Sequence, residues 1–173
     1  MSKAIRNIFG KKPTENFVFR DEEFEALGFQ LKGKVDKVFG RSLAIRELDA
    51  GSDNSVEIEL NNLSTPYYDV ERFGIGFVAS PRHADILIVT GAITRNMEEA
   101  AKKTFEAMPE PKFVVAVGND ACEIGIQNES YAVLGGAERI FNVDFKIPGN
   151  PPSPREIIRG LLAFVNGIEK QNK

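Results

Sequence analysis

The sequence predicts an α/β protein whose mostly parallel sheet is covered by helices on both faces. Two near-continuous apolar runs, at 85–90 and 112–118, are typical of strands that are buried on both sides. Strand patterns alternate with helix patterns along the chain, and this alternation indicates a parallel sheet. A length of 173 residues with 42% apolar residues is enough for one domain with a sizeable core.

The predicted elements follow one another in order from residue 42. The predicted strands are 42–48, 74–78, 85–90, 112–118 and 139–144. The predicted helices are 56–63, 97–108 and 154–166, the last of which has Pro near its first turn and one apolar side. Ligands of parallel sheets bind beyond the carboxyl ends of the strands. We therefore expect functional residues in the loops that follow residues 48, 90, 117 and 144.

Residues 1–41 are predicted to be an extension that precedes a domain formed by residues 42–173. In the first 12 residues, Ile5, Ile8 and Phe9 fall on one side of a possible helical turn, with lysine and arginine elsewhere. This pattern fits an arm that docks on a partner or a membrane surface, and a frayed tail is the alternative. A strand-like pattern at 17–19 and a helix-like pattern at 22–31 follow.

Composition excludes several classes of function. A net charge of −3 gives no basic excess for nucleic acid, and no apolar run is long enough for a membrane span or a signal peptide, so we expect a soluble cytoplasmic chain. The single cysteine, Cys122, allows neither an internal disulfide nor an all-thiolate metal site. With His83 as the single histidine, no nucleophile–base pair stands out, and we expect no independent enzyme activity.

Three segments carry a resemblance to a known family. Residues 68–75 (YDVERFGI), 80–94 (SPRHADILIVTGAIT) and 109–112 (PEPK) resemble the small, electron-transfer subunit of membrane-bound energy-converting [NiFe] hydrogenases and the equivalent subunit of complex I. The resemblance extends over about residues 42–165. It implies a flavodoxin-like, doubly wound domain that docks against a large subunit and holds one [4Fe-4S] cluster with four cysteines.

The cluster cysteines that the resemblance implies are missing from this chain. Where the family has Cys-Asn-Gly-Cys-Glu-Ile-Glu, residues 53–59 read Asp-Asn-Ser-Val-Glu-Ile-Glu, so Asp53 and Val56 take the first two ligand positions. Asp120 takes the third and Asn150 the fourth. Thiolate sulfur holds iron covalently, which a carboxamide does poorly and an isopropyl group cannot do, so we expect no cluster and no cofactor.

The content of the vacated site is open at this point. Asp53, Asp120 and the Asn150 carbonyl offer oxygen ligands to a hard cation such as Mg²⁺ or Ca²⁺, and a plug of waters and hydrogen bonds is the alternative. A two-residue shift that brings Cys122 into the site supplies only one thiolate. Cys122 is therefore predicted to be a buried free cysteine.

Five charged or titratable residues near the site are predicted to face a partner. Glu59 matches a family carboxylate near the large-subunit interface, where a buried carboxylate would relay protons or answer a partner's charge. The alternative is a Glu on the side of a helix that is capped by solvent or by a neighbouring basic residue. Arg72 and Arg82 are expected to pair with Asp53 or Asp120 or to hold loops. Glu57 and His83 are expected at the rim of the interface.

These observations predict a non-redox structural or assembly subunit of a hydrogenase-like or complex I-like oxidoreductase complex. Its expected partners are a hydrogenase-like large subunit and membrane-arm subunits, with peripheral association at the cytoplasmic side of the membrane. One alternative is an active electron-transfer subunit that uses an unusual cofactor in the vacated site. Another is a free-standing domain that binds a small molecule or a cation.

Overall fold

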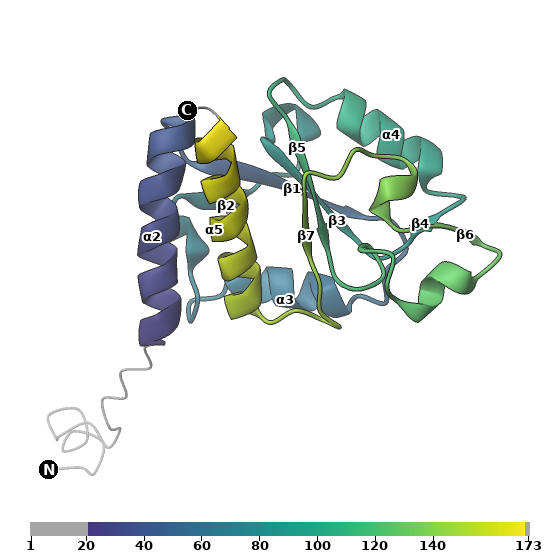
Figure 1. The fold of residues 1–173 in the computed structure, drawn as a ribbon, viewed down its shortest axis with the longest axis horizontal. Coiled ribbons are helices and arrows are strands. Elements are labelled where there is room, and N and C mark those ends of the chain that lie inside the picture. Colours follow the sequence, from purple (N-terminus) through teal and green to yellow (C-terminus); the bar gives the residue numbers. More distant parts are fainter. Residues whose placement is uncertain (1–20, 172–173) are drawn as a thin grey trace, which may run out of the picture.

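A five-stranded parallel sheet forms the centre of the computed structural model, which describes residues 21–171 (Figure 1). The strands are β1 (Leu43–Asp49), β2 (Ile75–Phe77), β3 (Ile86–Thr90), β5 (Phe113–Val117) and β7 (Phe145–Ile147). Their order is β2-β1-β3-β5-β7, and every pairing in this sheet is parallel. In the central register, Ile88 of β3 lies between Glu47 of β1 and Val115 of β5.

Helices cover both faces of this sheet. One face carries α2 (Glu22–Phe39), α3 (Ser55–Leu63) and α5 (Pro154–Gln171). The other carries α4 (Glu98–Glu106) and an antiparallel pair formed by β4 (Ile93–Thr94) and β6 (Val133–Gly135). Short 3₁₀ turns complete the described chain: η1 (Val70–Phe73), η2 (Pro81–His83), η3 (Ile126–Glu129) and η4 (Ala137–Arg139). The predicted α/β fold with a mostly parallel sheet is confirmed.

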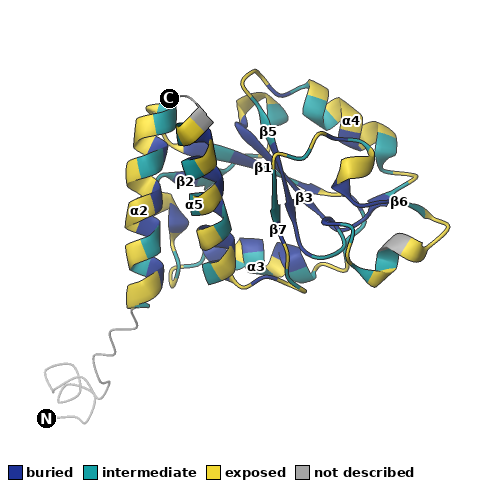
Figure 2. Cartoon of the chain, viewed as in Figure 1, coloured by how far each residue is buried: buried dark blue, intermediate teal, exposed yellow. Residues whose placement is uncertain are grey.

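The two faces have separate hydrophobic cores, with the dark buried strands of Figure 2 between them. Side chains of β3 and β5 alternate between the two cores, and all of them from Ile86 to Val89 and from Val114 to Val117 are at most 1% exposed. The two apolar runs in the sequence are therefore the doubly covered central strands. Among the described residues, no helix has the length and hydropathy that a membrane span requires.

Helix α2 belongs to the same packing unit as the domain. It lies beside α5 (Figure 1), and Phe24, Leu31 and Val35 are buried in the core that α5 also lines. The boundary expected at 41/42 therefore does not separate two units in the described part of the chain, because residues 22–39 bury their apolar side against the sheet and α5. The expected docking arm at 1–12 and the pattern at 17–19 lie outside the described residues.

The strand predicted at 139–144 is wrong. Residues 137–139 form η4, and the strand that pairs with β5 is β7, at 145–147. The apolar residues that suggested a strand instead fill the core under α4, where the rings of Phe141 and Phe105 lie 5.4 Å apart. As a result, the last functional loop follows Ile147 and not Asp144. The β4–β6 pair was not predicted because its strands are only two and three residues long.

Candidate functional site

The four vacated ligand positions converge on one small pocket at the carboxyl end of the sheet. Asp53 and Val56 come from the start of α3, Asp120 from the loop after β5, and Asn150 from the loop after β7. The pocket is also lined by Ser52, Ser55, Gly91, Gly118 and Asn119. Its volume of about 10 Å³ is room for about one water molecule, which is far less than a four-iron cluster needs.

Val56 fills the side of the pocket that faces β5. Its side chain is 5% exposed and packs over Gly118, where an added β-carbon would lie 2.7 Å from Val56 Cγ2. Gly118 also has φ +91°, a conformation that other residues adopt only with strain. An isopropyl group thus packs closely on the backbone turn that ends β5.

The polar side chains around the pocket hold its loops together. Asp53 Oδ1 accepts hydrogen bonds from Ser55 Oγ at 2.6 Å and Ser55 N at 3.0 Å, and these bonds lower the pKa of Asp53. Asp120 Oδ1 accepts one from Gln127 N at 3.1 Å. Asn119 Oδ1 accepts from Gly149 N at 2.9 Å, and Asn119 N donates to Gly149 O at 2.8 Å. The loops after β5 and β7 are therefore joined by an asparagine.

This donor set does not fit the family's cluster. None of the four converging residues supplies sulfur, and no group of three or more His, Cys, Asp or Glu side chains suited to a metal ion occurs in the described residues. Cys122 is buried elsewhere, with Sγ 3.6 Å from Ala116 O, and it does not line the pocket. Burial raises the pKa of the Cys122 thiol to about 11, which disfavours the thiolate that iron requires.

Glu57 is buried beneath α3, and not at the rim of a partner surface as predicted. It is 5% exposed, and the hydroxyl of Thr90 donates a hydrogen bond to Glu57 Oε1. Glu57 Oε2 has no hydrogen-bond partner among the described residues. Burial, followed by the charges of Glu57 and Asp49, raises the pKa of nearby Glu47. Two acid groups, Glu57 of α3 and Glu47 of β1, are thus buried or partly buried near this end of the sheet.

The other predicted partner residues are spread around the domain. Glu59 is half-buried and accepts a hydrogen bond from Asn62 Nδ2 at 3.3 Å. Arg72 reaches α2, where its Nη1 lies 3.2 Å from Glu25 Oε1, so it pairs with neither Asp53 nor Asp120. Arg82 and His83 are exposed on η2, just before β3 and thus near the amino end of the sheet. The structure does not bring these residues together at the pocket.

Two features of this region were missed by sequence reasoning. No role was assigned to Asn119 from the sequence, and Thr90 was included only as the last residue of the predicted strand 85–90. The Asn119–Gly149 contact joins residues 30 positions apart and carries no local sequence signal. The Thr90–Glu57 contact carries no such local signal because the two residues are 33 positions apart.

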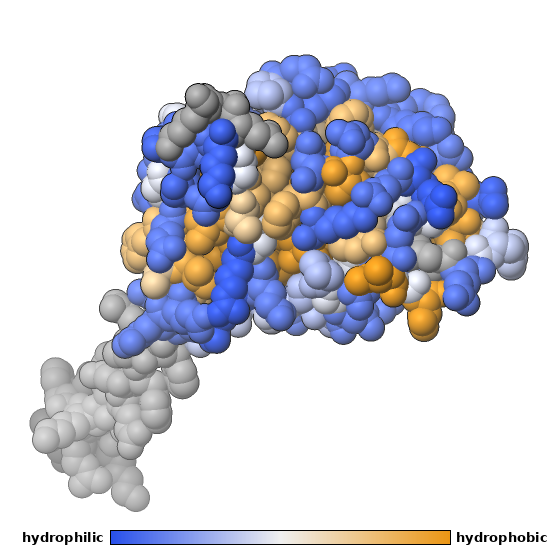
Figure 3. Space-filling model, viewed as in Figure 1, coloured by the Kyte–Doolittle hydropathy of each residue, from blue (hydrophilic) through white to orange (hydrophobic). Residues whose placement is uncertain are grey.

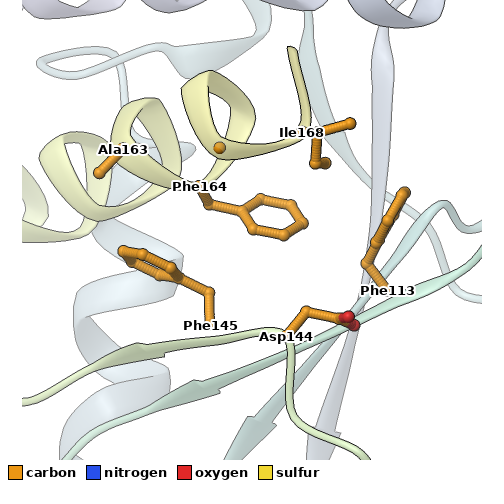
Figure 4. Close-up of a pocket in the computed structure, with 7 residues that line it drawn as sticks. Phe113, Asp144, Phe145, Ala163, Phe164 and Ile168 are labelled. Carbon is orange, nitrogen blue, oxygen red and sulfur yellow. The ribbon is translucent and has the colours of Figure 1, made fainter. Parts of the chain in front are cut away.

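A second hollow lies near the opposite end of the sheet, between α5 and the start of β7 (Figure 4). It has a volume of about 110 Å³, and Phe164 lies between Phe113 and Phe145, with ring centroids 5.5 and 6.0 Å away. Asp144 lies beside Phe113, and one of its carboxylate oxygens accepts from Val114 N. This hollow is not part of the vacated site.

Comparison with known families identifies the complex I subunit family that the sequence motifs resemble. Residues 54–164 match the family described as the 20 kDa subunit of NADH ubiquinone oxidoreductase. The chain belongs to this family. The match begins one residue after Asp53 and extends into α5, so it includes three of the four positions that line the pocket.

Two curated relatives are described as a formate hydrogenlyase subunit and a probable membrane-bound hydrogenase subunit. Formate hydrogenlyase subunit 7 of Escherichia coli is 38% identical over 82% of this chain, which spans about 55% of that relative. A protein described as a probable membrane-bound hydrogenase subunit of Pyrococcus furiosus is 41% identical over 79% of this chain and 82% of its own length. The small-subunit resemblance read from the sequence is thereby confirmed.

Solved structures show the same fold. A chain of the membrane-bound sulfane sulfur reductase, an archaeal respiratory membrane complex, superposes with a TM-score of 0.68 at 30% identity, covering 82% of this chain and 77% of that one. A [NiFeSe] hydrogenase chain from Desulfovibrio vulgaris Hildenborough has a TM-score of 0.52 at 15% identity, covering 77% of this chain and 62% of that one. The second comparison concerns the fold alone.

Proposed function

We propose that this chain is a non-redox structural subunit of a membrane-bound oxidoreductase complex related to energy-converting hydrogenases and complex I. It docks against a hydrogenase-like large subunit and joins the membrane arm through the complex, peripherally and on the cytoplasmic side. The relatives support membership in such a complex, since they are subunits of a formate hydrogenlyase and a membrane-bound hydrogenase.

One observation carries the non-redox part of the proposal. The four positions that hold the cluster in the family converge on a pocket with room for about one water molecule, and their side chains are two aspartates, a valine and an asparagine. Electron transfer needs a redox centre, and this donor set provides no soft ligands for iron. Backbone N–H groups donate hydrogen bonds to the side chains of Asn119, Asp53 and Asp120, and these bonds order the loops in place of metal coordination.

The test compares the wild-type chain with a variant in which the four ligands are restored. The variant carries Asp53→Cys, Val56→Cys, Asp120→Cys and Asn150→Cys, and a matched control carries Val56→Cys alone. Each affinity-tagged chain is purified anaerobically from its native host, with and without its associated proteins, and iron and acid-labile sulfide are measured per chain. We expect no iron in isolated wild-type or control chains and a partial content of iron and sulfide in the quadruple variant.

Two results would contradict the proposal. About four iron atoms per isolated wild-type chain, with the visible absorption of a cluster, would show that the chain is a redox subunit. Recovery of the tagged chain alone, as a monomer absent from the membrane fraction, would favour a free-standing domain.

A further inference from the structure

The loops that follow β1, β5 and β7 form an acidic surface. The carboxyl ends of parallel strands share one edge of a sheet, so the segments 49–64, 118–132 and 148–153 are neighbours, and we call them together the carboxyl-end face. They contain no Lys or Arg and seven acidic residues, of which Glu57 is buried and the other six are exposed or partly buried: Asp49, Asp53, Glu59, Asp120, Glu123 and Glu129. The rest of the chain carries 22 Lys and Arg against 18 Asp and Glu. The net charge of −3 therefore originates at this face.

Large apolar side chains are exposed on the same segments. Six large apolar side chains of the described residues are exposed, and four of them belong to the carboxyl-end face: Ile58, Ile124, Ile126 and Tyr131. Ile126 and Tyr131 are 91% and 92% exposed. Figure 3 shows apolar atoms gathered at the lower right of the molecule, over the segment around η3. Single exposed apolar residues are ordinary, whereas a concentration on one acidic face is typical of a binding surface.

Uncharged groups donate the hydrogen bonds that hold two of these carboxylates. Asp49 Oδ1 accepts from the backbone of Gly51 and Ser52, and Glu59 accepts from an asparagine amide. Hydrogen bonds from uncharged donors stabilise a carboxylate and leave its negative charge in place. Glu123, in contrast, is paired with Arg139 at 2.6 Å.

Two basic residues at the nearby start of α5 do not neutralise the face. Arg155 forms ion pairs with Asp21 and Glu23, and Arg159 with Glu23. Arg95, directly after β4, donates to the carbonyl of Tyr131 at 2.9 Å and lies at the border of the face. The arginines of α5 are therefore already paired with the carboxylates of Asp21 and Glu23.

We infer that the carboxyl-end face binds a protein surface that is basic around an apolar centre. This inference rests on the proposed function, because it specifies the chemistry of the subunit that this chain meets. The isoleucines and Tyr131 provide apolar contact area, and the carboxylates select and orient a partner with lysine and arginine. Anionic lipid and nucleic acid repel a face of this charge, so a membrane surface is not its occupant.

Zero-length carbodiimide cross-linking tests this charge complementarity directly, since it joins carboxylates to lysines that touch them. The sample is the native complex, purified through an affinity tag on this chain. Its cross-linked residues are identified by mass spectrometry. We expect cross-links from Asp49, Glu59 and Glu129 to lysines of another subunit. Glu106 and Glu110 precede β5 at the opposite end of the sheet and are exposed, so they serve as reference carboxylates.

A pair of charge-matched variants gives the second readout. Glu59→Lys with Glu129→Lys reverses two charges on the face, and Glu106→Lys with Glu110→Lys makes the same net change at the other end. We expect the face variant to retain roughly tenfold less partner subunit at moderate salt, and the reference variant to retain as much as wild type. Thermal unfolding of each isolated variant verifies that it is folded.

Three outcomes separate the hypotheses. Cross-links at the face together with a selective loss in the face variant support the inference. The inference is overturned if the complex is intact, its cross-links come from Glu106 and Glu110, and the reference variant is the one that loses partner subunit. This result leaves the proposed function standing. Recovery of the chain without any partner overturns both.

Discussion

Replacing Asn119 with alanine tests whether hydrogen bonds hold the loops of the vacated site. The substitution removes the acceptor of the 2.9 Å bond from Gly149 N, and it keeps the backbone bond from Asn119 N to Gly149 O. Both residues are only partly buried, so water reaches the freed N–H and limits the loss. We expect about 1 kcal/mol of lost unfolding free energy, which corresponds to roughly 2–4 °C for a chain of this size.

The matched control is Asn119→Asp, which retains an oxygen acceptor of the same length. Guanidinium unfolding measures the free energy, and amide hydrogen exchange at Gly149 measures the bond itself. We expect Asn119→Ala to lower protection of this amide severalfold and Asn119→Asp to preserve it at neutral pH. Equal stability of Asn119→Ala and wild type, with unchanged exchange at Gly149, would refute a role for this asparagine in joining the loops.

Three further predictions concern packing, pH and reactivity. Gly28→Ala should destabilise the chain by about 1–3 kcal/mol, because its β-carbon would overlap the ring of Phe73, whereas Gly33→Ala on the same helix has open space and should stabilise by about 0.5–1 kcal/mol in chemical denaturation. Two lysines of α2 lower the pKa of Glu169 to about 2, so its stabilisation is present above the unfolded value near 4.5 and is lost as pH falls toward 2. Glu169→Gln should therefore lower the thermal midpoint at pH 7 and leave it nearly unchanged near pH 2, and an equal loss at both would contradict this. The buried Cys122 thiol should react with a thiol reagent at pH 8 only at the rate of unfolding, and rapid reaction in the folded chain would show that it is accessible.

Replacement of the four cysteines changes what the neighbouring residues contribute to this region. In a cluster-bearing chain, metal–sulfur bonds hold the loops at the carboxyl end of the sheet. In this chain, Val56 packs on Gly118 and Asn119 bonds Gly149, so the same loops are held by packing and hydrogen bonds. Under the proposed function, these contacts would preserve the shape of the docking surface without a redox centre.

Local pattern predicted the central elements because each of them has a distinctive sequence. The run at 85–90 became β3 and that at 112–118 became β5, since strands covered on both faces are apolar at every position. The helix-like pattern at 22–31 extends to Phe39 in the structure. The strand predicted at 139–144 was wrong because the apolar residues of this segment pack in the core without forming a strand. Hydrophobic periodicity cannot distinguish a buried strand from a buried irregular segment.

The sequence by itself determined the fold class, the family, and the absence of the four thiolates, because strand patterns, long motifs and residue types are all local properties. The resemblance implied that Asp53 and Asn150, 97 positions apart, belong to one site, and only the tertiary structure decided that this site is a pocket with room for about one water molecule. It alone placed Glu57 inside the domain, brought Asn119 to Gly149, and gathered the acidic loops on one face. These contacts depend on which strands are neighbours in the sheet, and strand order is fixed by the packing of helices that are distant along the chain.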